Sequence, residues 1–555
     1  MRALLILFLC LWASIAWGDS FGADGFPQSA GAVATGGGGG GGGTSVPYTL
    51  PTGEVVHYIS PTGDDQANGL TPGAAWKTPN HPMKCGSVII AAPGAYSGGW
   101  QDSEWGTVDP ASCPSTTGGI DGAGGVQFAV LLCGGNVGTC TQNGNAFEAF
   151  RIATSHWSVQ GWLGTQNASA QGGCFNGEND VTKQNYVAFI NDIAAGCDLD
   201  GFGASGGPCS GCGSFDHIAI VGVVSFNGAQ SISGFCGSGI SPIPGNADGD
   251  TQTHIYVAGY FGAYNTNASG AGECAVGTIP GAPHSDGEGI IFDTYGAGYT
   301  TSGFDKGVVL RDAVIWRSGN NCLQVFPQGN GTSNDKAQYN FRNLSCYANN
   351  QDPKAGCAGE ASLHGVYPTG IGSYLLTNSL IMATQTKCGG TGLVIDAAMT
   401  LYGHDNHITA LDPAKINVSG NYIWQSAGTT TNVVGPPNTY VVNNAGGAPV
   451  FNDPWVYGAN TYANPGFTNP TALFSSAPNC TSYLNVTDCM NDVAGLAVYS
   501  KIKPTVAPIT MGYQPPAACA SDPLFPTWLK GIVYLRWTGS AITMNSGLVS
   551  KPCNL

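Results

Sequence analysis

Apolar and polar residues alternate in short runs through the middle of the chain, where a nine-residue pattern recurs eight times. Apolar residues occupy its first and third positions and usually its seventh and ninth, and the fifth is always Gly, Asn or Asp. The copies are WSVQGWLGT (157–165), VAFINDIAA (187–195), IAIVGVVSF (218–226), IYVAGYFGA (255–263), VVLRDAVIW (308–316), YNFRNLSCY (339–347), YLLTNSLIM (374–382) and INVSGNYIW (416–424). Gly, Asn and Asp tolerate left-handed backbone angles best. Each copy therefore predicts two short strands with a sharp bend between them.

The spacing of the copies indicates the architecture. From Gly161 to Asn191 the central residues are 30 positions apart, and from Gly259 to Asp312 they are 53 apart. A constant unit with variable spacing is typical of a solenoid that has one coil per unit and inserted loops. No segment keeps a helical period. With a third strand in each coil, the expected fold is all-β, a right-handed parallel β-helix with three sheets; the alternative is a β-sandwich.

The third strand is expected upstream of each bent pair. The candidate segments are GISPIP (239–244), GIIFDT (289–294), CLQVFP (322–327), LHGVYP (363–368) and GLVIDA (392–397). Alternation predicts one inward stack, made of Ile240, Ile290, Leu323, Leu363 and Leu393. It also predicts a polar outer face with Glu288, Asp293, Asn321, Gln324, Ser362, His364, Thr391 and Asp396. Repeat proteins use such extended faces for binding, and polymers suit them.

With these motifs, the chain resembles the right-handed parallel β-helix superfamily, the pectate-lyase-like fold, in its secreted bacterial-type members. The start at 57–79 and 86–99 is similar to the extended strand and first coil of that superfamily. Residues 285–296 and 311–326 are similar to its coils, and 464–470 to an element after the last coil. The resemblance spans residues 55–470 and implies the fold; a fold alone does not give an activity.

The domain organisation follows from composition along the chain. Residues 1–18 have a positive start, a short apolar run and a small-residue cleavage site, which predicts a secretory signal peptide. A Gly-rich flexible linker is expected at 19–50, and the entry strand with the first coils at 51–150. The regular β-helix is expected at 151–430, and a disulfide-rich cap at 431–555. The expected location is extracellular.

Cysteine usage agrees with an oxidising destination. Of the 19 cysteines, Cys10 lies in the signal sequence, which leaves an even number. This favours disulfides over metal clusters. Cys209 and Cys212 form a CxxC without a second such motif, so they are interpreted as loop disulfide cysteines. In the C-terminal region the expected pairs are Cys480–Cys489 and Cys519–Cys553.

Composition and charge restrict the partners. The chain has 85 glycines, only 9% charged residues and a formal net charge of −16. The acidic balance disfavours nucleic acid and anionic membranes, and it disfavours a polyuronate substrate unless metal ions mediate. The uncharged surface suits ladders of hydrogen bonds between coils, and it also suits the hydroxyl groups of neutral glycans.

The candidate catalytic residues are Asp286, Glu288, Asp293, His364 and Asp396, all near the third strand. Paired carboxylates can act as acid and base in glycoside hydrolysis. Carboxylates could also hold Ca²⁺ for a lyase, which further needs a base and a cation. The nearest cations in the sequence are Lys306, Arg311 and Arg317. The alternative interpretation is that the acidic residues make turn and ladder hydrogen bonds.

No specific enzyme signature is present. The sequence lacks the motif set of polygalacturonases and the Arg-x-Pro-x-x-Arg motif of pectate lyases. Three hypotheses remain: a glycoside hydrolase or polysaccharide lyase, a non-catalytic glycan-binding adhesin, and a structural extracellular protein. Four tryptophans could stack on sugars, although the register puts several of them near the core: Trp157, Trp162, Trp316 and Trp424.

Overall fold

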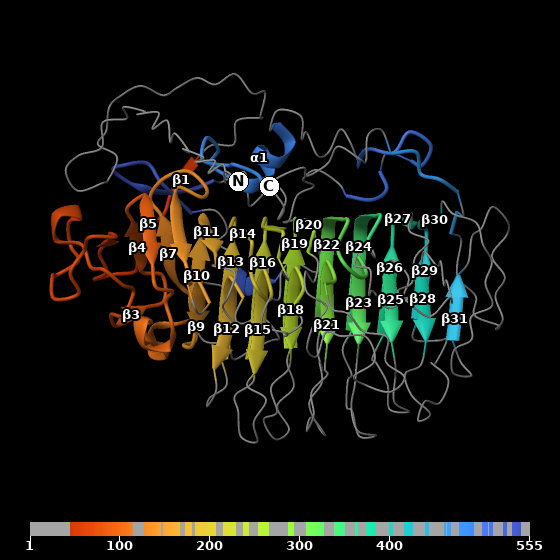
Figure 1. The fold of residues 1–555 in the computed structure, drawn as a ribbon. Helices are drawn as coiled ribbons and strands as arrows, with labels where there is room; N and C mark the ends of the chain where they lie inside the picture. Colours follow the sequence, from red (N-terminus) through yellow and green to blue (C-terminus); the bar gives the residue numbers. More distant parts are fainter. Residues whose placement is uncertain are drawn as a thin grey trace, which may run out of the picture.

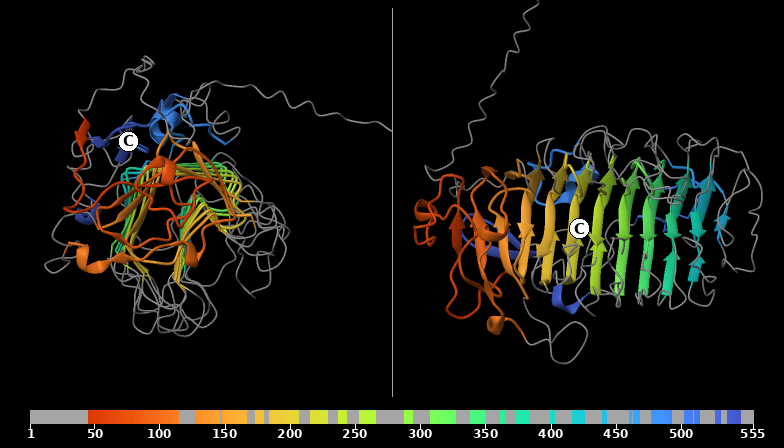
Figure 2. Two further views of the ribbon diagram at one scale, coloured as in Figure 1. Left: turned by 90° about the vertical axis from the view of Figure 1, so that its left-hand side faces the viewer. Right: turned by 60° about the horizontal axis from the view of Figure 1, so that its bottom comes forward.

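A computed structural model describes most of the coil strands and much of the chain around them. The described residues are 45–114, 127–145, 148–166, 173–179, 184–206, 215–228, 237–243, 253–265, 287–293, 307–326, 338–349, 361–364, 373–383, 399–402, 416–425, 439–442, 460–461, 463–467, 477–492, 502–508, 510–513, 526–529 and 535–545. Their strands stack side by side along one long axis (Figure 1). Viewed along that axis, the strands of successive coils lie over one another in distinct strand sets (Figure 2).

Two of these strand sets belong to one 19-stranded sheet and correspond to the two halves of the repeated unit. The first strand set consists of β4 (Val88–Ala91), β7 (Ala129–Cys133), β10 (Trp157–Gln160), β13 (Gln184–Ile190), β16 (Phe215–Val221), β19 (Thr253–Ala258), the first halves of β22 (Gly307–Trp316) and β24 (Gln338–Tyr347), β26 (Ser373–Thr377) and β29 (Ile416–Ser419). The second strand set consists of β5 (Gly94–Ser97), β8 (Cys140–Asn143), β11 (Trp162–Thr165), β14 (Ile193–Ala195), β17 (Val224–Phe226), β20 (Phe261–Ala263), the second halves of β22 and β24, β27 (Leu380–Ala383) and β30 (Tyr422–Gln425). All pairings between neighbouring coils in these sets are parallel.

The bend between the two sets is left-handed at every predicted centre. All eight central residues have positive φ, from 53° to 81°. They are Gly161, Asn191, Gly222, Gly259, Asp312, Asn343, Asn378 and Gly420. The sequence pattern therefore identified the bend correctly in every copy, because only residues that accept this conformation occur there.

The third strand set forms a separate nine-stranded sheet. Its strands are β9 (Phe150–Ile152), β12 (Phe175–Asn179), β15 (Phe202–Gly206), β18 (Ile240–Ile243), β21 (Ile290–Asp293), β23 (Leu323–Phe326), β25 (Ala361–His364), β28 (Met399–Tyr402) and β31 (Thr439–Val442). Every pairing is parallel except the last, where β31 runs antiparallel to β28. The predicted right-handed parallel β-helix with three strand sets is confirmed.

Two of the predicted third strands are shifted. In β25 it is Ala361, not Leu363, that pairs with Leu323, and Leu363 pairs with Val325. The strand that pairs next is β28, where Met399 is the partner of Ala361, so the third strand of that coil is not the predicted 392–397. Residues 392–397, including Leu393 and Asp396, lie outside the described residues. A slip of two residues leaves the same face inside, so alternation alone could not detect it.

A continuous stack of apolar side chains fills the interior. On the first strand set, one position per coil is aligned from the first coil to the last. The members, all at most 1% exposed, are Ile89, Leu131, Val159, Phe189, Ile220, Val257, Leu310, Phe341, Leu376 and Val418. Burial of such aliphatic and aromatic side chains, at about 1.5–3 kcal/mol each, is the main stabilising term for the coils.

The described C-terminal residues pack along the sides of the β-helix. Trp528, Leu529 and Leu535 share one apolar cluster with outward residues of the first strand set. A second apolar cluster joins outward residues of the second strand set to helix α1 (Val486–Asp492) and to Tyr513. In both, residues far apart in sequence come together, as Figure 2 shows for the blue segments outside the coils. The description of 431–555 as a cap for the open end stays a prediction.

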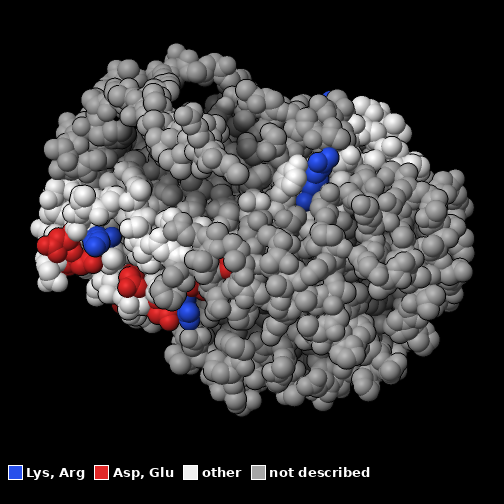
Figure 3. Space-filling model, in the orientation of Figure 1, with Lys and Arg blue, Asp and Glu red and all other residues white. Residues whose placement is uncertain are grey.

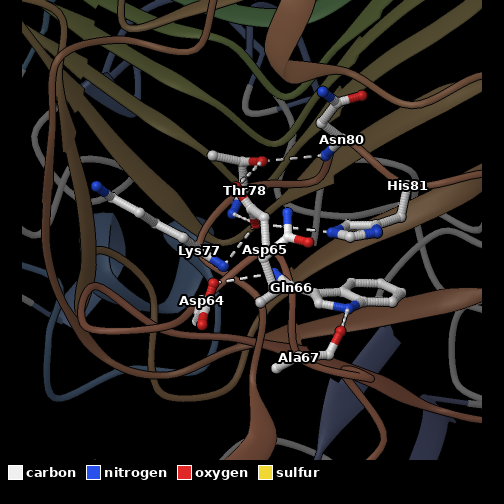
Figure 4. A network of polar contacts seen from close by, with 9 residues as sticks. Asp64, Asp65, Gln66, Ala67, Lys77, Thr78, Asn80 and His81 are labelled. Atoms are coloured by element: carbon white, nitrogen blue, oxygen red, sulfur yellow. Dashed lines mark hydrogen bonds and ion pairs between the residues drawn. The ribbon is translucent and has the colours of Figure 1, made fainter.

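The N-terminal entry loop is held by one carboxylate. Oδ1 of Asp65 accepts hydrogen bonds from the backbone N–H groups of Lys77 (2.8 Å) and Thr78 (2.9 Å). Its Oδ2 accepts one from the Thr78 hydroxyl at 3.1 Å (Figure 4). The ring of Trp76 stacks on that of His81, with centroids 3.7 Å apart. These contacts close the loop that leads from β2 (His57–Ile59) into the first coil.

Five disulfides link described cysteines, as the even cysteine count predicted. They are Cys85–Cys113, Cys133–Cys140, Cys174–Cys197, Cys322–Cys346 and Cys480–Cys489. The last confirms one of the two pairs expected in the C-terminal region. Cys209, Cys212, Cys519 and Cys553 lie outside the described residues.

Candidate functional site

The ends of the strands in the nine-stranded sheet bring several candidate residues into one row. Asp293, the last residue of β21, pairs with Phe326 of β23. His364, the last residue of β25, pairs with Tyr402 of β28. Leu363 is the partner of Val325, so His364 is level with Phe326 in the register. We call Asp293, Phe326, His364 and Tyr402 the strand-end row. Neighbouring strands are about 4.8 Å apart, which puts the backbones of Asp293 and His364 roughly 10 Å apart.

Glu288 lies in a different setting, fully buried at the start of the same sheet. Its Oε2 accepts a hydrogen bond from the Ser238 hydroxyl, and its Oε1 accepts one from the Asn320 amide, both at 2.8 Å. Ser238 and Asn320 belong to the coils before and after Glu288, and Ser238 N–H also donates to Asp200 at 2.7 Å. These contacts form a polar ladder inside the protein. The geometry favours a role for Glu288 in joining coils.

The other predicted site residues divide into described and undescribed ones. Asp286 and Asp396 lie outside the described residues, as does Lys306. Arg311 is 4% exposed and forms an ion pair with the buried Asp312 in the bent pair. It therefore lies away from the nine-stranded sheet, as the repeat register predicted. Burial raises the pKa of Asp312, and the guanidinium of Arg311 partly offsets that effect.

Polar residues do line the outer side of the nine-stranded sheet, but those near the starts of its strands are buried. Ser241 is 5% exposed and Gln324 1% exposed, and the Asn321 amide donates to Gln324 Oε1 at 2.9 Å. Of the four tryptophans considered for sugar stacking, Trp157, Trp162 and Trp316 are each 0% exposed, and Trp424 is partly buried against an apolar cluster. The strand-end row, of which the structure describes the backbone register, is the remaining candidate for ligand contact on this sheet.

A second constellation was not found from the sequence. It is a stack of rings along the beginning of the first strand set, made of His156, Tyr186, His217 and His254. The ring centroids of Tyr186 and His217 are 4.3 Å apart, and those of His217 and His254 are also 4.3 Å apart. All four residues have positive φ, between 57° and 68°. We call these four residues the ring ladder.

A carboxylate lies beside the last two rings of this ladder. Asp216 Oδ1 is 3.0 Å from Nδ1 of His254, and Asp216 Oδ2 is 3.3 Å from Nδ1 of His217. The three side chains are 10–14% exposed, so they contact solvent only at their edges. The indole of Trp528 packs edge-on against His217, with centroids 5.5 Å apart.

At the other end of the ladder, His156 lies near sulfur atoms that cannot bind a metal. Its Nδ1 is 3.5 Å from the sulfur of Cys113, but Cys113 is joined to Cys85 in a disulfide. Burial lowers the pKa of His156, and only its contact with the Gln127 carbonyl opposes this shift.

The sequence contained a signal for the ring ladder. Each member directly precedes one copy of the nine-residue unit, at Trp157, Val187, Ile218 and Ile255. The residue before the unit is thus aromatic or histidine in four consecutive coils. The next coil has Gly307 at this position, because Val308 pairs with Ile255.

The described surface carries few charges. On the face drawn in Figure 3, most charged side chains of the described residues lie at the end with the N-terminal elements, acidic beside basic. In the N-terminal region, Lys84 and Glu54 form an ion pair, with Nζ and Oε1 2.7 Å apart. No helix in the described part of the chain has the length and apolar character needed to cross a bilayer.

Comparisons with known proteins give little beyond the fold. No protein-family model matches the chain, and no curated protein matches it. One similar solved structure is titled "Crystal structure of pectate lyase Pel9A"; it has 10% identity and a TM-score of 0.39, over 79% of this chain and 89% of that one. Similarity at this level transfers no activity. On its own strand pairing, the chain is a right-handed parallel β-helix, as the resemblance in its sequence implied.

Proposed function

We propose that this chain is an extracellular protein that acts on or binds polysaccharide along the nine-stranded sheet. The carrying observation is the strand-end row, which aligns Asp293, Phe326, His364 and Tyr402 across adjacent coils. By residue type, an acid, a histidine and two aromatic residues at neighbouring register positions would supply proton transfer and sugar stacking along one polymer path. The regular repeat suits a polymer, because each coil adds the same step along the axis.

The distribution of apolar contacts supports this choice of surface. Among the described residues, the C-terminal segments join apolar clusters with the first and second strand sets. Those two outer faces are thus occupied by the chain itself. Among the described residues, no C-terminal segment shares an apolar cluster with outward residues of the nine-stranded sheet, and we place the polymer along the strand ends of that sheet.

Hydrolysis or β-elimination is the chemistry we propose for this surface. In a hydrolase, Asp293 would pair with a second carboxylate, for which Asp286 and Asp396 are the candidates. In a lyase, His364 would act as the base, and Ca²⁺ held by carboxylates would neutralise the uronate. Glu288 would support the site from inside, through its contacts with Ser238 and Asn320.

Extracellular location is supported by two features. Five disulfides between described cysteines are typical of an oxidising compartment. Residues 1–18 have the pattern of a secretory signal peptide. The second candidate function is a glycan-binding adhesin without catalysis, favoured by the burial and hydrogen bonding of Glu288.

The test is a panel of neutral and acidic polysaccharides incubated with the full chain, with Ca²⁺ or with a chelator. New reducing ends would indicate hydrolysis, and unsaturated uronate products would indicate a lyase. Asp293→Asn and His364→Ala should lower the rate by about 10²-fold or more. Asp64→Asn removes an exposed carboxylate of the N-terminal entry loop, outside the nine-stranded sheet, and should retain full activity. Binding without products would support the adhesin, and neither binding nor products would contradict the proposal.

A further inference from the structure

Three potential metal ligands converge at the end of the ring ladder, away from the strand-end row. The donor atoms of Asp216, His217 and His254 all lie within 4.8 Å of one another. Two residues come from the coil of β16 and one from the coil of β19. Two imidazoles and one carboxylate are the donor set that Zn²⁺ and similar transition ions prefer, whereas Ca²⁺ and Mg²⁺ prefer oxygen alone.

The separations of the donor atoms match a coordination sphere. Zinc binds imidazole nitrogen and carboxylate oxygen at about 2.0–2.2 Å, so neighbouring ligand atoms around a tetrahedral ion are roughly 3.3–3.5 Å apart. The Asp216 oxygens are 3.3 Å from Nδ1 of His217 and 3.0 Å from Nδ1 of His254. An ion held by the Asp216 carboxylate and the two Nδ1 atoms would therefore need a rotation of the His254 ring but no movement of the backbone.

The backbone holds the ligands in place before any ion arrives. His217 and His254 have the same left-handed conformation, with φ of 57° each, in consecutive coils. Their rings stack with an interplanar angle of 24°, supported by Tyr186 on one side and the edge of Trp528. The His217 backbone N–H also donates to Asp216 Oδ1 at 2.8 Å, which fixes the carboxylate.

The neighbouring coil leaves room for the rings to turn toward a shared ion. Stacked rings direct their lone pairs in parallel planes, so His254 must rotate for both nitrogens to face one ion. Its neighbour in the next coil is Gly307, where a Cβ atom would meet no heavy atom of the described residues within 4 Å. The side chains of the three ligands retain 10–14% exposure, which gives the ion a route in and leaves a position for water.

We propose that Asp216, His217 and His254 form a binding site for a divalent transition ion of the zinc type, which clamps two adjacent coils. Each imidazole binds through Nδ1 as the neutral ring, and its remaining proton resides on Nε2. Where Nδ1 donates to Asp216 before binding, that proton shifts to Nε2 through solvent. Three protein ligands and one water are the arrangement of open zinc sites.

The test uses the full chain freed of metal by a chelator. Titration with Co²⁺ should give the visible absorption of a tetrahedral Co²⁺ complex that saturates at one ion per chain, and Zn²⁺ should displace it. Zn²⁺ should also raise the thermal midpoint, since an ion that binds only the folded chain stabilises it. Asp216→Asn and His254→Ala should weaken binding by about 100-fold or more.

His156→Ala is the matched control. His156 belongs to the same ladder, but its Nδ1 is 2.7 Å from the Gln127 carbonyl, so this variant should bind Co²⁺ as the parent chain does. If His254→Ala does not fold, as judged by circular dichroism, the conservative Asp216→Asn decides the outcome. The proposal is overturned if the parent chain shows no saturable Co²⁺ absorption, or if His156→Ala loses binding as Asp216→Asn does.

Discussion

The side-chain amide of Asn343 donates a hydrogen bond to Oδ1 of Asp312, 2.8 Å away in the preceding coil. Both residues are central residues of the repeated bend, and both have positive φ. Asn378, the central residue of the next coil, in turn donates to Oδ1 of Asn343 at 2.6 Å. The residues chosen for backbone conformation thus also link three coils through their side chains.

This relationship predicts a graded loss of stability at Asn343. Asn343→Gly keeps the left-handed conformation but removes both side-chain hydrogen bonds, so unfolding should become easier by about 1.5–3 kcal/mol. Asn343→Ala also strains the backbone and should cost about 1 kcal/mol more. Urea unfolding of both variants measures the two values. Equal stability of parent, Gly and Ala variants would contradict the role of this ladder.

Asp192 predicts a loss of stability as pH rises above the ordinary pKa of a carboxyl group. It is completely buried, and burial raises its pKa well above the ordinary value, although the Trp162 N–H donates to its Oδ1 at 2.8 Å. A raised carboxyl pKa means that the folded chain holds a proton that the unfolded chain has lost. The stability that this proton contributes is fully present below the unfolded pKa of about 3.9. As pH rises from there through the folded pKa, the free energy of unfolding falls by at most about 1.4 kcal/mol per pH unit.

Asp192→Asn should remove that slope and leave the hydrogen bond from Trp162 in place. The measurement is the free energy of unfolding between pH 4 and pH 9, for the parent chain and the variant. The difference between them should grow with pH in favour of the variant. Parallel curves would show that Asp192 does not lose its proton on unfolding.

Asp65 predicts the opposite dependence in the entry loop. Burial alone would raise its pKa, but the N–H groups of Thr78 and Lys77 together with the Thr78 hydroxyl outweigh it and lower the pKa. Its contribution is present above the unfolded pKa and is lost as pH falls through the folded value. Hydrogen exchange at the amides of Lys77 and Thr78 should accelerate in acid and in Asp65→Ala. Unchanged exchange in Asp65→Ala would contradict this account; Asp64→Ala is the control.

The packing of Trp528 predicts a large contribution of the C-terminal segment to the stability of the chain. It is 1% exposed and packs against Phe128, Tyr186 and His217. Trp528→Ala should destabilise the chain by about 3–5 kcal/mol, because it empties a closely packed site. Trp537, which is less buried and contacts Tyr58, serves as the comparison, and its change to Ala should cost less. Thermal unfolding measures both, and equal losses would contradict the packing described.

The fold was predictable because the central position of the repeated unit requires a residue that accepts a left-handed φ. Gly222, Asp312 and Asn378 all occupy the bend, and their residue types already indicated left-handed φ. The third strand was less certain, since pairing Leu323 with Ala361 instead of Leu363 is a two-residue slip, which keeps the same alternating face inside.

The sites were only partly predictable. The ring ladder was not predicted because His217 and His254 lie one residue before the nine-residue unit. The alternation of apolar and polar residues, which identified the unit, does not extend to that position. The row of Asp293 and His364 follows from the strand register, whereas no period constrains Asp286, which lies outside the described residues. Glu288 belongs to the predicted cluster by sequence, whereas its burial arises from contacts with neighbouring coils.

The central claim is that polysaccharide lies along the nine-stranded sheet. Its most direct test is hydrogen exchange of the full chain with and without the polysaccharide that it binds best. Amides in β21, β23 and β25 should become protected, while those of β13 and β16 in the first strand set should not change. Protection confined to β13, β16 and the segment around Trp528 would contradict the account.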